Sequence, residues 1–259
     1  MFRAIASLNA VAKKLAHLID SSELQADEKT KIKDTIQSAV LPFLELQITA
    51  SGKSTVMPVS SLAPLLTEWT LASKTLISAL PTEQLFPVVD LWRIGFLTPT
   101  VGAWVSEAPA STPGATSSIV SELLHQTRLK PLPRSFVLTL LKFLCNAFGT
   151  PALSQQLLSP GPLRDNLTDL VVSQLLEEEN QVRTTAASLV FNIACCTQMH
   201  REGAGKQEFN PQIYSGVDAE WEIEVVSAVI EGIRREKSEE IREFCVVTRR
   251  AIRLKSLSP

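Results

Sequence analysis

The chain has 259 residues, with 25 Lys and Arg against 27 Asp and Glu, so its net charge at pH 7 is −2. A near-neutral chain lacks the basic excess of a general nucleic-acid-binding protein, and its hydrophobic fraction of 45% excludes a wholly disordered one. Four cysteines without close, regular spacing argue against a disulfide-stapled secreted fold. They indicate a reducing compartment, so we expect the cytoplasm, with the nucleus as a further location.

The first twenty residues allow two interpretations. Arg3, Lys13 and Lys14 precede any acidic residue, a composition that resembles a mitochondrial transit peptide. The same segment also predicts a first helix with an apolar face formed by Phe2, Ile5, Leu8, Leu15 and Leu18. We favour the helix, because one arginine is few for a presequence.

Helical periodicity continues through the first half of the chain. A second helix is predicted from about Asp27 to Leu46, followed by a polar break over residues 51–59. A third helix follows Ser60 and Ser61, which we expect to cap its N-terminus.

A fourth helix is predicted between Thr82, as its N-cap, and Pro99, as its stop. Residues 107–118 are rich in Pro, Ser, Thr and Ala and predict a flexible loop. Hydrophobic helices continue on both sides of this loop. We therefore expect an N-terminal helical extension over residues 1–50 and one continuous domain over residues 51–259.

The second half has the clearer pattern. Helices are predicted over about 134–148, 163–176, 180–199, 219–235 and 238–254, with a polar loop over 200–217. The longest uncharged stretch, 143–163, is interrupted by Gly149, Pro151, Pro160, Gly161 and Pro162. It cannot form one continuous helix, so we expect no membrane span.

Three of these helices carry one narrow polar line on an otherwise mostly apolar surface, with residues at i, i+4, i+7 and i+11. The lines are Ser135, Thr139, Lys142 and Asn146; then, 46 residues later, Gln181, Thr185, Ser188 and Asn192; then Ser238, Arg242, Cys245 and Arg249. Upstream, LWRIGFL around Arg93 resembles LLKFLCN around Lys142.

A period near 46 residues with paired helices is typical of armadillo and HEAT repeats. Helices that are apolar on nearly every side must be covered by neighbours, as in a stack of helix pairs. The sequence therefore predicts an all-α, armadillo/HEAT-like right-handed superhelix, in which the polar lines share one concave face.

The segments LLKFLCNAF (Leu140–Phe148), VRTTAASLVFNIACC (Val182–Cys196) and SEEIREFCVVTRRAI resemble the PUL domain, the armadillo-like domain of the phospholipase A2-activating protein type. The family pairs a helix of pattern L-(R/K)-x-x-x-N with a later A-x-x-x-L-N helix and a closing helix that bears arginine. Those features correspond here to Lys142 and Asn146, to Asn192, and to Arg242. The tract ALPTEQLFPVVDLWRIGFL resembles PUL regions fused to thioredoxin-like or permuted papain-fold peptidase domains, and the resemblance covers about residues 56–255.

The resemblance implies a protein-interaction domain of the ubiquitin pathway. It implies a basic groove that holds the C-terminal tail of the AAA+ segregase valosin-containing protein, with Lys142 where arginine is common. Partner-binding candidates are Arg93, Lys142, Asn146, Asn192, Arg242 and Arg249. We expect a protein partner, neither nucleic acid nor membrane, and no cofactor.

Each candidate also has a structural interpretation. Lys142 is equally consistent with a ligand contact and with a lysine whose ammonium reaches water at the end of its groove. Asn146 and Asn192 more readily bond the backbone of an adjacent repeat than a ligand. Arg93 has Asp90 available at i, i+3. Arg242 has Glu239 nearby, and Arg249 begins a basic run that could be a solvated helix end.

Catalysis and metal binding have little support in the sequence. All four cysteines fall in apolar helical runs, where thiols are commonly buried and inert. Cys196 and His200 could supply two metal ligands, but a structural zinc site needs four. We therefore expect no enzyme and no metal. The alternatives are an armadillo-type scaffold for another extended peptide, and the non-catalytic part of a thiol peptidase or redox protein.

Overall fold

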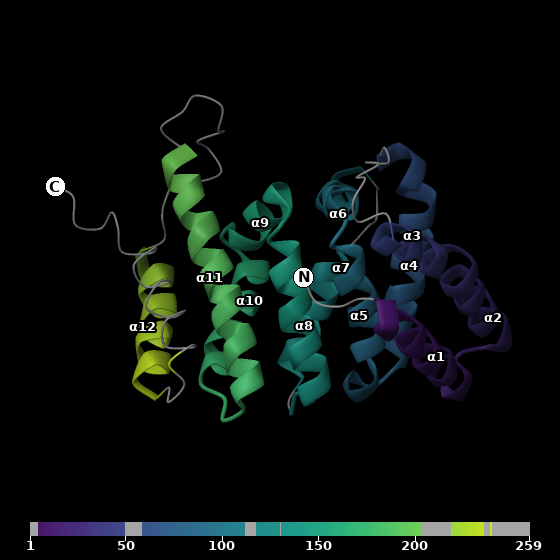
Figure 1. Cartoon of the computed structure of the whole chain (residues 1–259), viewed down its shortest axis with the longest axis horizontal. Coiled ribbons are helices and arrows are strands. Elements are labelled where there is room, and N and C mark those ends of the chain that lie inside the picture. The colour runs from purple at the N-terminus through teal and green to yellow at the C-terminus, as the bar shows by residue number, and fades with distance from the viewer. Residues whose placement is uncertain are drawn as a thin grey trace. The chain divides into compact units, whose positions relative to one another are not determined.

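The computed structural model describes residues 5–49, 59–111, 118–129, 131–203, 219–235 and 239. Every regular element in these ranges is a helix, and none is a strand (Figure 1). The all-α, armadillo-like class predicted from the sequence is therefore confirmed. Internal contacts divide the chain into Met1–Leu153 (unit 1) and Ser154–Pro259 (unit 2). The predicted boundary near residue 50 stays a prediction.

Unit 1 begins with α1 (Ile5–Ser21), which buries Leu8, Leu15 and Leu18 as the helix interpretation predicted, and also Ile19. Phe2 and the side chain of Ile5 lie outside what the structure describes. One long helix follows, made of α2 (Ala26–Thr35), the π turn η1 (Ile36–Val40) and α3 (Leu41–Thr49). Pro42 explains the π turn. Proline has no N–H to donate to a carbonyl of the preceding turn, and its ring would clash with that carbonyl in a regular α-helix. The wider turn is visible in the bond from the Leu41 N–H to the Ile36 carbonyl.

The next elements of unit 1, between residues 59 and 147, are helices and 3₁₀ turns. They are α4 (Val59–Ala79), η2 (Thr82–Gln84), α5 (Phe86–Gly95), α6 (Pro99–Ser111), α7 (Ile119–His125), η3 (Gln126–Arg128) and α8 (Arg134–Ala147). Helix α5 packs on α1, α4 and above all α8.

Several predicted helix ends in unit 1 are wrong. Helix α4 begins at Val59, so Ser60 and Ser61 lie in its first turn. The N-cap of α5 is Leu85, because Thr82 instead starts the separate 3₁₀ turn η2. Pro99 starts α6, a helix that the sequence interpretation missed.

The predicted loop over residues 107–118 is also shorter than expected, because residues 107–111 continue α6. Ser118 caps α7 by accepting a hydrogen bond from the Ser121 N–H. Residues 112–117 lie outside the described ranges.

Unit 2 follows the predicted pattern more closely. Its helices are α10 (Pro162–Leu175), α11 (Asn180–Gly203) and α12 (Ala219–Arg235), and both α11 and α12 pack on α10. Helix α9 (Pro151–Leu158), which was not predicted, contains the boundary between the units. Residues 200–203 extend α11 into the predicted loop, and the predicted helix over 238–254 lies outside the described residues except for 239.

An aromatic stack fixes α5 against its neighbours in unit 1. The rings of Trp69 (α4) and Trp92 (α5) stack with centroids 3.9 Å apart and an interplanar angle of 10°. The Trp92 indole N–H donates to Ser73 Oγ at 2.8 Å. Phe96 meets Phe143 of α8 edge to face at 5.0 Å. These contacts fix the C-terminal end of α5, where Arg93 lies, against α4 and α8.

No single helix in the described residues is long and apolar enough to cross a membrane, although α8 and α9 together reach that length and hydropathy as a bent pair.

Candidate peptide-binding site

The seam between α5 and α8 brings together three of the six predicted site residues. These helices lie side by side (Figure 1) and form the most extensive helix pair of unit 1. Helix α8 buries Phe143 and Leu144 and leaves Lys142 and Asn146 half-buried. Arg93 comes from the facing helix, α5. We call Asp90, Arg93, Lys142 and Asn146 the seam cluster.

Arg93 is a buried cation with a partner on its own helix. Its exposed fraction is 7%, and its Nε donates to Asp90 Oδ1 at 2.5 Å. This confirms the pairing at i, i+3. A guanidinium at this depth needs a counter-charge, because desolvating an unpaired charge is costly. Arg93 is therefore largely shielded from solvent, while its charge still reaches Lys142 on the facing helix.

Asn146 completes the C-terminus of α5. Its Nδ2 donates to the backbone carbonyl of Arg93 at 2.8 Å. The last carbonyls of a helix have no N–H partner within the helix. The neighbouring carbonyls of Trp92 and Gly95 accept hydrogen bonds from the backbone N–H groups of Phe96 and Thr98. The Arg93 carbonyl accepts its hydrogen bond from the Asn146 side chain instead. The predicted bond to the backbone of an adjacent helix is confirmed.

Lys142 is the more accessible cation of the seam cluster. Its half-buried position lowers the pKa of the ammonium below 10.5, and the neighbouring charge of Arg93 lowers this pKa further. The carboxylate of Asp90 acts in the opposite direction and raises it. Lys142 is thus a partly desolvated cation whose attraction to an anion is stronger than that of a fully solvated lysine.

The two polar lines within the described residues, those of α8 and α11, lie on the more exposed sides of their helices. In α8, Ser135 is exposed and Thr139 half-buried, and the Thr139 hydroxyl donates to the Ser135 carbonyl at 2.7 Å. In α11, the half-buried Ser188 donates to the Thr184 carbonyl at 2.9 Å. Their hydroxyls are thus satisfied within the helix.

The other predicted site residues belong to unit 2. Asn192 is half-buried on α11. Arg242 and Arg249, together with Cys245, lie outside the described residues. That the polar lines share one concave face therefore stays a prediction.

The described cysteines have the character of buried thiols. Burial raises the pKa of Cys145 to about 12, and burial also raises the pKa values of Cys195 and Cys196. A thiol with a raised pKa forms little thiolate, the reactive species, at neutral pH. The described part of the chain contains no group of His, Cys, Asp and Glu placed to hold a metal.

Sequence reasoning missed a cluster in unit 2. The Arg164 guanidinium carbon of α10 lies 5.2 Å from the ring centroid of Trp221 on α12, and the Trp221 indole N–H donates to Thr168 Oγ1 at 2.8 Å. Arg164 and Thr168 lie at i, i+4 on α10, and this spacing was the signal available in the sequence. The cluster attaches α12 to α10 by a cation–π contact and a hydrogen bond.

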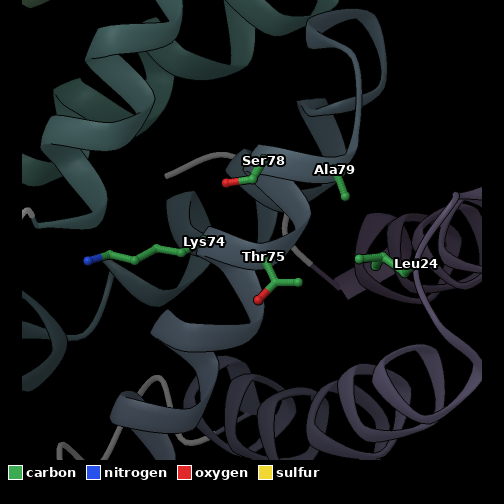
Figure 2. Close-up of a pocket in the computed structure, with 5 residues that line it drawn as sticks. All are labelled: Leu24, Lys74, Thr75, Ser78 and Ala79. Carbon is green, nitrogen blue, oxygen red and sulfur yellow. The ribbon is translucent and has the colours of Figure 1, made fainter.

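An open pocket of about 430 Å³ lies between α4 and the turn after α1. Its lining is Leu24, Lys74, Thr75, Ser78 and Ala79. Figure 2 shows the Lys74 side chain extending away from Leu24. The one charged residue of the lining therefore points away from the apolar wall of the pocket. This pocket is a weaker candidate for an anionic ligand than the seam cluster.

Comparison with known proteins agrees with the fold. A family model described as the PUL domain matches residues 1–248, which include the first fifty residues and all but the last few of the stretch of the sequence resemblance. None of the curated proteins and none of the solved structures gave a match. Nearly the whole chain thus fits one family of helical protein-interaction domains, and the chain belongs to the PUL domain family.

Proposed function

We propose that the chain binds the C-terminal tail of an AAA+ segregase, valosin-containing protein, and so serves the turnover of ubiquitin-modified or ubiquitin-like-modified proteins. The observation that carries this proposal is the seam cluster, where a partly desolvated lysine on α8 faces a buried arginine on α5 within a PUL domain. A terminal carboxylate is the complementary group, since hydrogen bonds to an ionised partner are stronger than neutral ones.

The residues have different roles in this proposal. Lys142 contacts the ligand carboxylate, and the buried Arg93 adds positive electrostatic potential at that position. Asn146 positions α5 by its bond to the Arg93 carbonyl. Asn192, Arg242 and Arg249, which belong to unit 2, are further proposed partner-binding residues.

The proposal makes the chain a binding module without catalytic activity of its own. The raised pKa values of Cys145, Cys195 and Cys196 support this, because none of these thiols is activated as a nucleophile. The proposed place of action is the cytoplasm, extending to the nucleus, in keeping with the reducing compartment that the cysteine content indicates.

The test is a titration of the purified chain with a fluorescent tail peptide. Lys142→Glu should weaken binding more than Lys142→Gln, because repulsion is added to the lost attraction. Lys31→Glu is the matched control, since Lys31 is exposed on α2 outside the seam cluster. Thermal melts accompany each titration, and all variants should melt close to wild type.

Three results would contradict the proposal. Unchanged affinity in Lys142→Glu with an intact fold would remove Lys142 from the site. Binding of an unrelated acidic peptide as tightly as the tail peptide would favour a general peptide scaffold. Substrate turnover by the isolated chain would contradict the absence of catalysis.

A further inference from the structure

The turn between α9 and α10 contains a serine followed by proline. Ser159 and Pro160 lie outside both helices, and Pro160 is exposed while Ser159 is half-buried. The next residue, Gly161, has a φ of 143°, and a Cβ added to it would meet no atom within 4 Å apart from its chain neighbours. The turn is therefore open to the surroundings on this side.

We propose that Ser159 is a phosphorylation site for a proline-directed protein kinase. Such kinases select proline after the acceptor serine, because another residue would place a backbone N–H without a partner in the kinase groove. In the transfer, Ser159 Oγ forms a bond to the γ-phosphorus of ATP, the bond from this phosphorus to the β,γ-bridging oxygen breaks, and ADP leaves. The hydroxyl proton passes to the catalytic carboxylate of the kinase. This inference does not depend on the proposed peptide ligand.

Two other described residues, Thr98 and Thr150, also precede proline, but the proline is in each case the first residue of a helix, α6 or α9. Thr150 is 8% exposed, and its Oγ1 would lie 1.9 Å from a Cβ added to Gly102, so it packs tightly against α6. The Thr98 carbonyl accepts a hydrogen bond from the Val101 N–H at 3.0 Å, which fixes Thr98 to the start of α6. Ser159, by contrast, is followed by two turn residues before α10 begins.

The hydrogen bonds at the end of α9 are compatible with a phosphate on Ser159. The Ser159 hydroxyl donates to the Gln155 carbonyl at 2.7 Å, and esterification removes this donor. The Ser159 backbone N–H also donates to the Gln155 carbonyl, at 3.0 Å, and to the Gln156 carbonyl, at 3.3 Å. Phosphorylation therefore costs α9 one side-chain bond and no backbone bond. It adds about −1.5 to −2 charges to unit 2.

A purely structural role for Ser159, as the residue that ends α9, predicts a different result. Leu157 and Leu158 directly before it are buried. If they held the turn too firmly for a kinase to bind it, the kinase would modify an unfolded peptide of this sequence and leave the folded chain unmodified. Comparison of the folded chain with such a peptide separates the two roles.

The experiment incubates the full chain with a purified proline-directed kinase of the mitogen-activated class, Mg²⁺ and ATP, and maps the phosphate by mass spectrometry. Wild type should gain a phosphoryl group on Ser159. Ser159→Ala should lose it, and so should Pro160→Ala, which keeps the acceptor hydroxyl. Thr98→Ala is the matched control, because Thr98 is also half-buried and precedes proline, and it should leave the phosphate on Ser159 unchanged. A synthetic peptide of residues 153–166 is the unfolded reference.

Three outcomes would overturn the inference. If the peptide is phosphorylated on Ser159 and the folded chain is not, the fold shields the site. If neither is phosphorylated there, the sequence around Ser159 is no substrate for this class of kinase. If Pro160→Ala is phosphorylated on Ser159 as fast as wild type, the kinase does not read the proline. None of these outcomes affects the titration with the tail peptide, so the proposed function is tested separately.

Discussion

At the scale of single residues, Lys142 shows how charged side chains on a neighbouring helix change the pKa of an ammonium group. Burial on α8 and the charge of Arg93 on α5 lower its pKa, while Asp90 partly restores it. The ammonium is therefore easier to deprotonate than in an unfolded chain. A carboxylate bound next to it would raise the pKa again, so binding and protonation are linked.

This linkage predicts the pH dependence of peptide binding. Affinity should be constant at neutral pH and should fall as the pH rises through the lowered pKa of free Lys142 towards 10.5, because binding then requires proton uptake. Titrations with the tail peptide over this pH range measure the effect. Lys142→Arg stays charged and should remove this fall. An identical fall in Lys142→Arg would assign the titration to another group.

Asn146 gives a prediction about stability. Asn146→Ala leaves the Arg93 carbonyl at the end of α5 without its donor, which should cost about 1–2 kcal/mol of unfolding free energy. Urea denaturation measures this cost. Asn9→Ala, at an exposed position of α1, is the control and should change stability by less than about 0.5 kcal/mol. Equal losses in both variants would contradict the capping role.

At the scale of helices, proline explains most of what the sequence interpretation missed. Pro99 and Pro151 were interpreted as stops, yet each is the first residue of a helix, α6 and α9. A proline at the first position costs nothing, because its missing N–H would have had no partner within the helix. Strongly periodic helices such as α8 and α12 were predicted to within a residue, because their apolar faces are continuous.

Gly95 marks a close approach between α5 and α4. A Cβ added there would lie 2.7 Å from Cη2 of Trp69, so Gly95→Ala must displace the indole from Trp92. We expect a loss of about 1–3 kcal/mol in unfolding free energy, measured by urea denaturation. Gly232→Ala on α12 is the control, since the nearest atom to its Cβ would be 3.9 Å away, and it should be neutral or stabilising. Destabilisation in Gly232→Ala equal to that in Gly95→Ala would contradict this steric argument.

At the scale of the whole chain, the net charge of −2 means that the protein as a whole does not attract an acidic peptide over long distances. The overall field does not steer an anion towards the protein, so the attraction must come from local cations such as Lys142. Raising the salt from 0.1 to 1 M shortens the Debye length from about 10 to about 3 Å. Affinity for the tail peptide should therefore fall in a fluorescence titration, whereas the association rate should change little. A rate that collapses with salt would contradict this local origin.

The site was predictable only in part, because some of its contacts join residues that are far apart in the sequence. The Asp90–Arg93 pair lies on one helix, so its spacing revealed it. The bond from Asn146 to the Arg93 carbonyl joins residues 53 positions apart, and the sequence indicated a backbone partner without identifying it. The i, i+4 spacing of Arg164 and Thr168 was visible in the sequence, but it did not identify Trp221, more than fifty residues later, as their partner.

The tryptophans of the chain are unevenly distributed between its two units, and this distribution affects the intrinsic fluorescence of each unit. Trp69 and Trp92 form a buried, face-to-face pair in unit 1, where Trp104 also lies, whereas Trp221 is the one tryptophan in the sequence of unit 2. Indole fluorescence responds to water and to stacking, so Trp221 emits from a half-exposed site and the stacked pair from a dry one. Subtracting the emission of a Trp221→Phe variant from that of wild type isolates the signal of unit 2. Each unit thus carries its own reporter, and unlabelled protein can reveal whether the two unfold together or in sequence.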